Sequence, residues 1–204
     1  MLIVLTGIDG SGKTTAARAL VDSARRAGMG ALFLGNYAGR RQMSLISGGL
    51  GVHLPLRLAD FLETAVRMFN VLNSHRRAHR FAGLVVMDRD LHCQLALRQM
   101  HGLPRGRWLP YLIRRLPQPD LIIYLDIDPR EAHARVLARG TDSERLEDLE
   151  SLNEAYQALP EFTRFAVIPA GGRPPEVLAR LQAAIAQASG GQAGEHSPAG
   201  PAPA

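Results

Sequence analysis

The stretch GIDGSGKT, residues 7–14, constrains the fold of this chain more than any other part of it. It matches the pattern G-x-x-x-x-G-K-[ST] in full, follows the apolar run MLIVL and precedes the helical stretch TTAARALVDSARRAG. In this arrangement the backbone N–H groups of the glycine-rich turn and the N-terminus of the following helix face phosphate oxygens. A strand, a phosphate-binding turn and a helix are therefore expected at the start of the chain.

One residue of this turn stands apart from the composition, because Lys13 is the only lysine among the 24 Lys and Arg residues. Arginine is a rigid fork, whereas the β and γ phosphates wrap around a compact charge on a flexible stem. We expect Lys13 to act catalytically on these phosphates and the hydroxyl of Thr14 to bind Mg²⁺. The predicted nucleotide-binding residues of the turn are Gly7, Asp9, Gly10, Ser11, Gly12, Lys13, Thr14 and Thr15.

Short apolar runs alternate with amphipathic stretches along the chain. Five runs, at residues 1–7, 30–35, 83–88, 120–126 and 165–170, are predicted to be buried strands with helices between them. This rhythm is typical of an α/β fold in which helices cover both faces of a parallel sheet. Polar residues stand at the strand ends and are expected to converge on one crevice; they are Thr6, Asn36, Asp88, Arg89, Asp126 and Asp128.

Two regions beyond the turn carry residues suited to phosphoryl transfer. Asp88 follows four apolar strand residues, as a magnesium ligand often does, and the adjacent Arg89 can reach a phosphate; a solvated strand end is the alternative. After the fourth strand, Arg135 and Arg139 share one helix face, and a loop containing Gly140 presents Arg145. We interpret residues 138–150 as a lid whose arginines neutralise charge on the phosphates, with exposed Arg–Glu pairing as the alternative.

Composition bounds the remaining possibilities. The 204 residues, 46% of them hydrophobic, fit one domain at residues 1–188, and the Gly/Pro/Ala-rich residues 189–204 are predicted to be a disordered tail. The net charge of +5 is scattered, which favours a small polyanionic ligand over nucleic acid. The single cysteine, Cys93, cannot form an internal disulfide, and no apolar run reaches membrane-spanning length, so we expect a cytoplasmic protein without a membrane partner.

The stretches GIDGSGKTT, VVMDRD and PDLIIYLDIDPREAHARVLARG, followed by ERLEDLESLNEAYQAL, resemble the thymidylate kinase branch of the nucleoside monophosphate kinases. The resemblance spans about residues 1–185. It implies a P-loop NTPase fold with three layers and a five-stranded parallel sheet in the order 2-3-1-4-5, a short lid, a homodimer, and transfer of the γ phosphoryl group of ATP to dTMP with Mg²⁺.

The resemblance also assigns roles to individual residues. Asp9 would approach the 3′ hydroxyl of the acceptor sugar, Arg89 would bind the acceptor phosphate, and Asp88 would act near Mg²⁺. The lid arginines would be Arg139 and Arg145, and Arg135 is counted with the ATP-binding residues. On the acceptor side, the predicted substrate-binding residues are Asp9, Tyr37, Phe69, Arg76 and Arg89.

The acceptor side departs from the family pattern. The stretch LGNYAGRRQ follows the second strand in place of the usual loop, and after DRD the positions of an aromatic, a serine, a tyrosine and a glutamine hold Asp90, Cys93, Leu97 and Arg98. Such exchanges alter the hydrogen bonding of a pocket and hence its specificity. Two alternatives therefore remain open beside a dTMP kinase: a related kinase of another small acceptor, and a nucleotide-binding module without turnover. A guanine-reading GTPase is disfavoured, since its N-K-x-D motif needs a second lysine.

Overall fold

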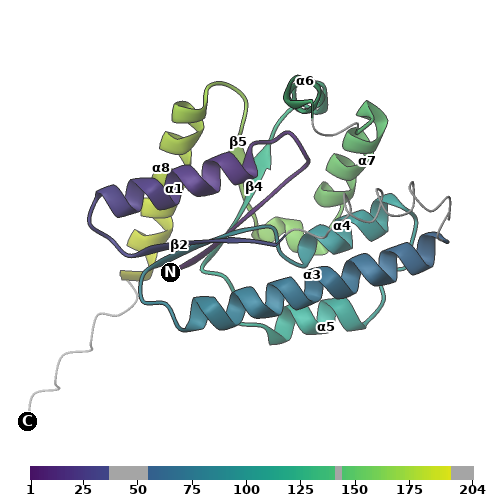
Figure 1. Cartoon of the computed structure of the whole chain (residues 1–204), viewed down its shortest axis with the longest axis horizontal. Helices are drawn as coiled ribbons and strands as arrows, with labels where there is room; N and C mark the ends of the chain where they lie inside the picture. The colour runs from purple at the N-terminus through teal and green to yellow at the C-terminus, as the bar shows by residue number, and fades with distance from the viewer. Residues whose placement is uncertain (37–54, 141–143, 194–204) are drawn as a thin grey trace, which may run out of the picture.

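Five short parallel strands form one sheet in the order β2-β3-β1-β4-β5 (Figure 1). The computed structural model describes residues 1–36, 55–140 and 144–193. The strands are β1 (Leu2–Thr6), β2 (Ala31–Gly35), β3 (Leu84–Asp88), β4 (Leu121–Asp126) and β5 (Ala166–Pro169). The predicted fold, strand order and direction are therefore confirmed, and each strand lies within the apolar run that predicted it.

Helices cover both faces of this sheet. One layer contains α1 (Lys13–Arg26) and α8 (Pro174–Ala193). The remaining helical elements are α3 (Leu56–His79), α4 (His92–Met100), α5 (Trp108–Arg115), α6 (Pro129–Arg139), α7 (Leu146–Gln157) and the 3₁₀ turn η1 (Pro160–Arg164). α1 packs on β2 and β3 and against α8, while α3 contacts β2 and α4 (Figure 1). In the described part of the chain, no helix is long and apolar enough to cross a membrane.

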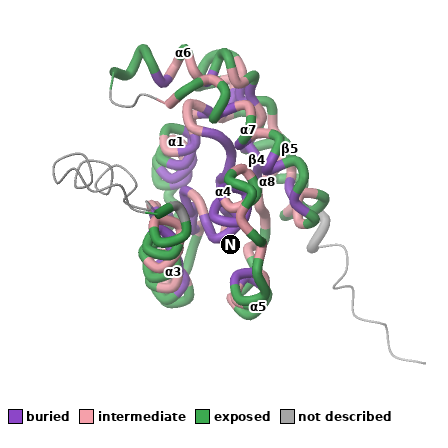
Figure 2. Tube along the Cα trace, turned by 90° about the vertical axis from the view of Figure 1, so that its right-hand side faces the viewer, coloured by how far each residue is buried: buried purple, intermediate pink, exposed green. Residues whose placement is uncertain are grey.

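Alternation along β1 explains why the sheet carries a core on both faces. Ile3 and Leu5 join a large cluster that includes Leu20 of α1, whereas Val4 joins a smaller cluster with Met87. Successive side chains of a strand point to opposite faces, so an apolar run without polar alternation is buried on both faces of the sheet. In Figure 2 the buried residues gather in the middle of the molecule and the surrounding helices carry most of the exposed ones. Such a run fixes β1 at the centre of the sheet, with its carboxyl end leading into the glycine-rich turn.

The C-terminal boundary differs from the predicted one. The last helix begins at Pro174, where its missing N–H costs least, and continues to Ala193. It therefore includes five residues that we assigned to the tail, Ser-Gly-Gly-Gln-Ala; the two glycines disfavour a helix, but adding residues to a helix that is already formed costs less than starting one. Residues 194–204 lie outside the described part of the chain.

Candidate active site

The glycine-rich turn between β1 and α1 packs directly against α6. Gly10 has a φ of 86°, and a Cβ atom there would lie 2.3 Å from the carbonyl oxygen of Ala132. A side chain is therefore excluded both by the left-handed backbone and by the neighbouring main chain. The glycine at this position of the motif allows the turn to approach α6 closely. The approach brings Arg135 and Arg139 of α6 beside the phosphate-binding turn.

Lys13 lies at the first turn of α1 and is only 4% exposed. Its Nζ donates a hydrogen bond to the carbonyl oxygen of Ile8 at 2.6 Å and lies 3.6 Å from Oδ1 of Asp9. Burial lowers the pKa of Lys13, and the carboxylate of Asp88 opposes that effect. A buried cation that bonds the loop itself can exchange this contact for a phosphate oxygen without first shedding water.

Thr14 and Asp88 meet at the carboxyl ends of β1 and β3. The Thr14 hydroxyl donates a hydrogen bond to Oδ2 of Asp88, while Oδ1 is buried and has no hydrogen-bond partner among the described residues. Burial raises the pKa of Asp88, and Lys13 counters this rise. A hydroxyl oxygen and an unpartnered carboxylate oxygen are the hard ligands that Mg²⁺ takes from a protein when phosphates and waters complete its shell, so these two residues fit the ion.

Arg89 follows Asp88 and points toward the same turn. Its guanidinium forms an ion pair with Oδ1 of Asp9. The register of the sheet explains the meeting, since Asp88 lies opposite both Leu5 of β1 and Gly35 of β2. Asp9 is thus shared between Lys13 and Arg89, and the phosphate-binding turn is linked to the end of β3 through charges.

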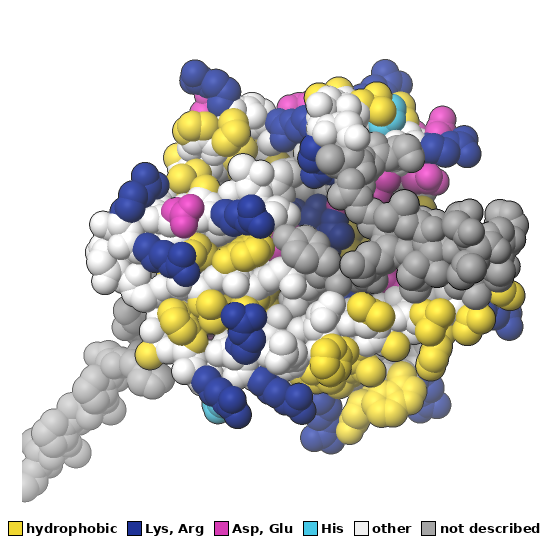
Figure 3. Space-filling view, viewed as in Figure 1, with side chains coloured by type: hydrophobic (Ala, Val, Ile, Leu, Met, Phe, Trp, Pro, Cys, Tyr) yellow, Lys and Arg dark blue, Asp and Glu magenta, His cyan; other side chains and the backbone are white. Residues whose placement is uncertain are grey.

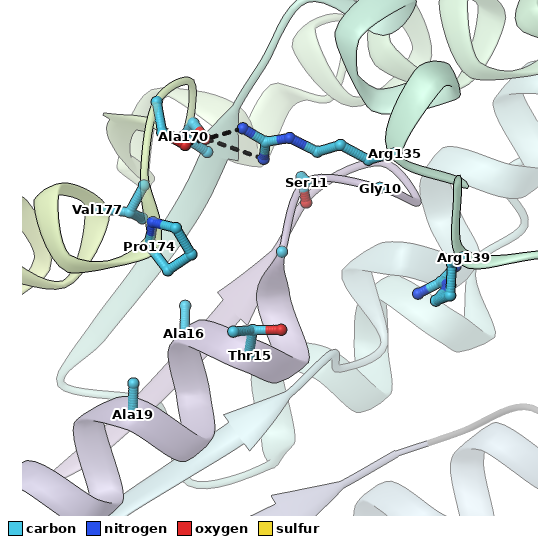
Figure 4. Close-up of a pocket in the computed structure, with 12 residues that line it drawn as sticks. Gly10, Ser11, Thr15, Ala16, Ala19, Arg135, Arg139, Ala170, Pro174 and Val177 are labelled. Carbon is cyan, nitrogen blue, oxygen red and sulfur yellow. Dashed lines mark hydrogen bonds between the residues drawn. The ribbon is translucent and has the colours of Figure 1, made fainter. Parts of the chain in front are cut away.

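A cavity of about 290 Å³ opens beside the turn (Figure 4). Its walls come from the turn, α1, α6 and the connection from β5 to α8. Arg135 and Arg139 both contribute to it, as the sequence predicted for their helix face. The guanidinium of Arg135 donates hydrogen bonds to the carbonyl oxygens of Ala170 and Gly172, both at 3.2 Å, and thereby ties α6 to the opposite wall. Gly10, Ser11, Gly12 and Thr15 line the same cavity.

The other predicted lid arginine lies elsewhere in the structure. Arg145 stands at the N-terminal boundary of α7, with a side chain that is 75% exposed and 3.3 Å from Glu147. It does not line the cavity that Arg139 lines. Residues 141–143, the centre of the predicted lid, lie outside the described part of the chain. Asp128 also differs from expectation: its carboxylate accepts a hydrogen bond from the Arg130 amide at 2.7 Å and caps α6.

Two predicted acceptor-binding residues face away from this site. Phe69 is 69% exposed, and Arg76 is exposed as well. Both project from the side of α3 opposite to the buried Arg67, because two and nine residues correspond to about half a rotation in a helix of 3.6 residues per turn. The structure therefore does not bring them to the crevice. Tyr37 lies outside the described residues.

The inner face of α3 instead carries a buried polar network that the sequence analysis missed. Arg67 is 1% exposed; it donates hydrogen bonds to Glu63 and to Gln94 of α4, both at 3.0 Å, while its Nη1 has no hydrogen-bond partner. Gln94 and Arg98 both bond the carboxylate of Asp60. The overlooked signal is the spacing: Asp60, Glu63 and Arg67 recur on one face of the helix, at intervals usual for core residues.

Cys93 lies buried between this network and the strand ends. Burial raises the pKa of its thiol, but the positive charges of Arg67 and Arg89 outweigh that effect and lower it overall. Nearby, Thr6 donates a hydrogen bond to the hydroxyl of Tyr156 at 2.9 Å. The space between α3, α4 and the end of β1 is therefore lined by polar side chains that bond mainly one another.

Known proteins with similar sequences show to which family this chain is related. A family model described as thymidylate kinase matches residues 5–180. A protein of Pyrobaculum calidifontis named probable thymidylate kinase is 30% identical and aligns over 92% of this chain and 97% of its own length. One of Pyrococcus abyssi, with the same name, is 33% identical over 70% of this chain and 72% of its own. A protein of Xanthomonas campestris named thymidylate kinase is 28% identical over 92% and 84% of the two chains.

Proposed function

Since this chain belongs to the thymidylate kinase family of nucleoside monophosphate kinases, we propose that it transfers the γ phosphoryl group of ATP to dTMP with the aid of Mg²⁺. The observation that carries the proposal is the ion pair between Arg89 and Asp9 beside buried Lys13. One charged group for an acceptor phosphate thus adjoins the site that holds the donor phosphates, as transfer in line requires.

The reaction needs no general base, because the attacking oxygen of a nucleotide phosphate is already ionised. Catalysis then consists of positioning and charge neutralisation. Lys13 binds the transferred phosphates of ATP, Arg89 orients the acceptor phosphate, and Arg139, together with Arg145 after closure of the lid, neutralises charge on the moving group. Thr14 and Asp88 would hold Mg²⁺, which when bound would supply electrostatic stabilisation of the donor phosphates.

A second candidate is a kinase of another small acceptor that uses the same donor site. The buried network of Glu63, Arg67 and Gln94 favours it, because Nη1 of Arg67 has no hydrogen-bond partner among the described residues and can donate to a polar group of an acceptor. A pocket built to bond polar groups rejects a ligand that leaves them unpaired. An acceptor richer in polar groups than thymine would satisfy such a pocket better.

One assay separates these functions. ADP release is measured in the presence of ATP and Mg²⁺ with dTMP, dUMP, UMP, CMP and nucleosides as acceptors. We expect dTMP to give the largest kcat/KM. A larger value for another compound contradicts the dTMP assignment and identifies the second candidate. If no acceptor accelerates ADP release although ATP binds, the chain is a nucleotide-binding module without turnover.

We also propose a cytoplasmic homodimer that pairs through the outer face of α3. Large apolar side chains gather there (Figure 3), with Phe61 64% and Phe69 69% exposed. An apolar patch of this kind on a kinase with polar substrates suits a second copy of the chain. The substitution Phe69→Arg should convert the dimer into a monomer in light scattering at micromolar concentration, whereas Arg26→Glu at the exposed end of α1 should leave the mass unchanged. A wild-type monomer contradicts the proposal.

A further inference from the structure

Arg89 has an unusual backbone. Its φ is 72°, and among the described residues it is the only non-glycine residue with a positive φ. For a residue with a side chain this conformation costs about 1 to 2 kcal/mol, so it persists only where neighbouring contacts impose it. The amide of Arg89 donates to the carbonyl oxygen of Leu5 at 2.9 Å, which fixes the residue on the side of β1.

Asn36 fixes Arg89 from the other side. Nδ2 of Asn36 donates a hydrogen bond to the Arg89 carbonyl oxygen at 2.6 Å. A carbonyl oxygen only accepts, so the amide nitrogen must be the atom that faces it. The Asn36 main chain belongs to the same unit, because its N–H donates to the carbonyl oxygen of Asp88 at 3.1 Å.

Ser74 of α3 holds this amide in place. Its hydroxyl donates a hydrogen bond to Oδ1 of Asn36 at 2.7 Å. Asn36 is fully buried and Ser74 is 5% exposed, so water cannot replace either contact. The two hydrogen bonds therefore require, at position 36, a side chain that accepts from Ser74 at one atom and donates to Arg89 at the other. Aspartate lacks the donor and leucine lacks both.

We propose that Asn36 is a positioning residue for the acceptor: it maintains the left-handed backbone of Arg89, which aims the guanidinium at Asp9 and at the acceptor phosphate. This inference rests on the proposed function in one respect, namely that Arg89 binds the acceptor. Asn36 itself touches no substrate in this scheme. Its loss therefore weakens acceptor use while the binding of ATP is unchanged.

The test compares Asn36→Leu and Asn36→Asp with the wild-type enzyme. We expect both to raise the KM for the best acceptor at least about tenfold and to leave the KM for ATP within about twofold, because displacing a charged group by about 1 Å can cost a hundredfold in rate. Ser74→Ala should shift the same parameter less. The double variant Asn36→Leu/Ser74→Ala should be no worse than Asn36→Leu alone, since the two residues act in series.

A second measurement needs no substrate. Hydrogen exchange of the Arg89 amide, followed by NMR in the free protein, should accelerate at least about tenfold in Asn36→Leu, while that of Val86 within β3 stays unchanged. Gln118→Leu is the control. The side-chain amide of Gln118 also donates a hydrogen bond to a carbonyl oxygen, that of Ile113 at 2.8 Å, but Gln118 precedes β4 and so lies at the opposite end of the sheet. It should alter neither measurement.

The outcomes are distinct. A wild-type protein inactive on dTMP contradicts the proposed function, and the inference is then tested on whichever acceptor is active and by the exchange of Arg89. If Asn36→Leu retains the wild-type acceptor KM, or if that KM rises without faster exchange at Arg89, Asn36 does not act through Arg89 and the inference is wrong. An equal loss of ATP and acceptor binding also overturns it, because that result indicates a general structural role.

Discussion

At the scale of single residues, the site depends on positions where only one side chain meets the local geometry. Lys13 is buried and bonds the turn it belongs to, Gly10 touches the main chain of α6, and Asp88 keeps one carboxylate oxygen without a partner. The first two of these constraints leave a trace in the sequence as fixed positions of the phosphate-binding stretch. These two, Lys13 and Gly10, also yield sharp expectations for conservative substitutions.

Replacing Lys13 by arginine keeps the charge and should still abolish most activity. The longer planar guanidinium cannot occupy a site in which Nζ lies 2.6 Å from the Ile8 carbonyl oxygen. We expect kcat to fall by at least about 100-fold, the usual cost of removing one positioned donor. Steady-state ADP release at saturating ATP measures this effect. Arg26→Lys at the exposed end of α1 is the reverse exchange and should leave kcat unchanged; an active Lys13→Arg would refute the argument from shape.

Gly10→Ala should raise the KM for ATP at least about tenfold and destabilise the protein. The added Cβ strains the backbone and also meets the Ala132 carbonyl oxygen at 2.3 Å. Gly28→Ala provides the control, because Gly28 has a similar φ of 78° but no atom within 4 Å of the position that a Cβ would take. The control should lose only about 1 to 2 kcal/mol in urea unfolding and bind ATP normally. Equal effects of the two substitutions on ATP use would mean that contact with α6 is unimportant.

At the scale of elements, α3 separates two kinds of surface. Its inner face carries Glu63, Arg67 and Ser74, while its outer face exposes Phe61 and Phe69. We had assigned Phe69 to the acceptor through the resemblance to the family. The actual face was decided by packing against β2 and α4, which a sequence of mixed polarity on both faces does not specify.

Glu63→Ala should destabilise the protein by about 3 kcal/mol, because it leaves the buried Arg67 without its carboxylate. The matched comparison is Glu131→Ala, which removes another Glu–Arg pair four residues apart, at 2.6 Å but with a half-exposed carboxylate. That change should cost less than about 1 kcal/mol. Urea unfolding of both variants measures the difference. Similar losses would show that water reaches the Arg67 site.

At the scale of the whole molecule, a buried acid–base pair makes global stability depend on pH. Nδ1 of His92 lies 2.5 Å from Oδ2 of Asp90. Burial alone would lower the pKa of His92 and raise that of Asp90, but each charge outweighs this effect on the other, so the pKa of His92 is raised and that of Asp90 is lowered.

The sign of the dependence follows from these directions. The contribution of His92 to the free energy of unfolding is complete below its unfolded pKa of about 6.5 and is lost as pH rises through its raised folded pKa. The contribution of Asp90 is complete above its unfolded pKa of about 3.9 and is lost as pH falls through its lowered folded pKa. His92→Gln should therefore be most destabilised near about pH 6, and its deficit should shrink as the pH rises toward about pH 9. Phe165→Leu, which removes the ring that packs on His92, should show a deficit independent of pH. A constant deficit for His92→Gln contradicts the charged pair.

What could be foreseen depended on how local its cause was. The phosphate-binding turn, the five strands and the cationic face of α6 were predictable, because each is encoded in consecutive residues or in a helical period. The bonds among Thr14, Asp88, Asp9 and Arg89 required only that strand ends meet at one edge of the sheet. The sequence by itself thus determined the fold, the family and the position of the glycine-rich turn at the carboxyl end of β1.

The buried polar contacts of α3 and Asn36 were decided only by the tertiary structure. In the sequence, Arg67 and Glu63 resemble ordinary exposed residues, and only the orientation of α3 in the fold buries them. Asn36 bonds Ser74 and Arg89 only because folding brings these two residues together from distant elements. Such polar contacts have no period in the sequence, since each depends on the packing of whole elements to within a hydrogen-bond length. The physical reason is range: the glycine-rich turn is built from consecutive residues, whereas the polar contacts of α3 and Asn36 join side chains that only folding brings together.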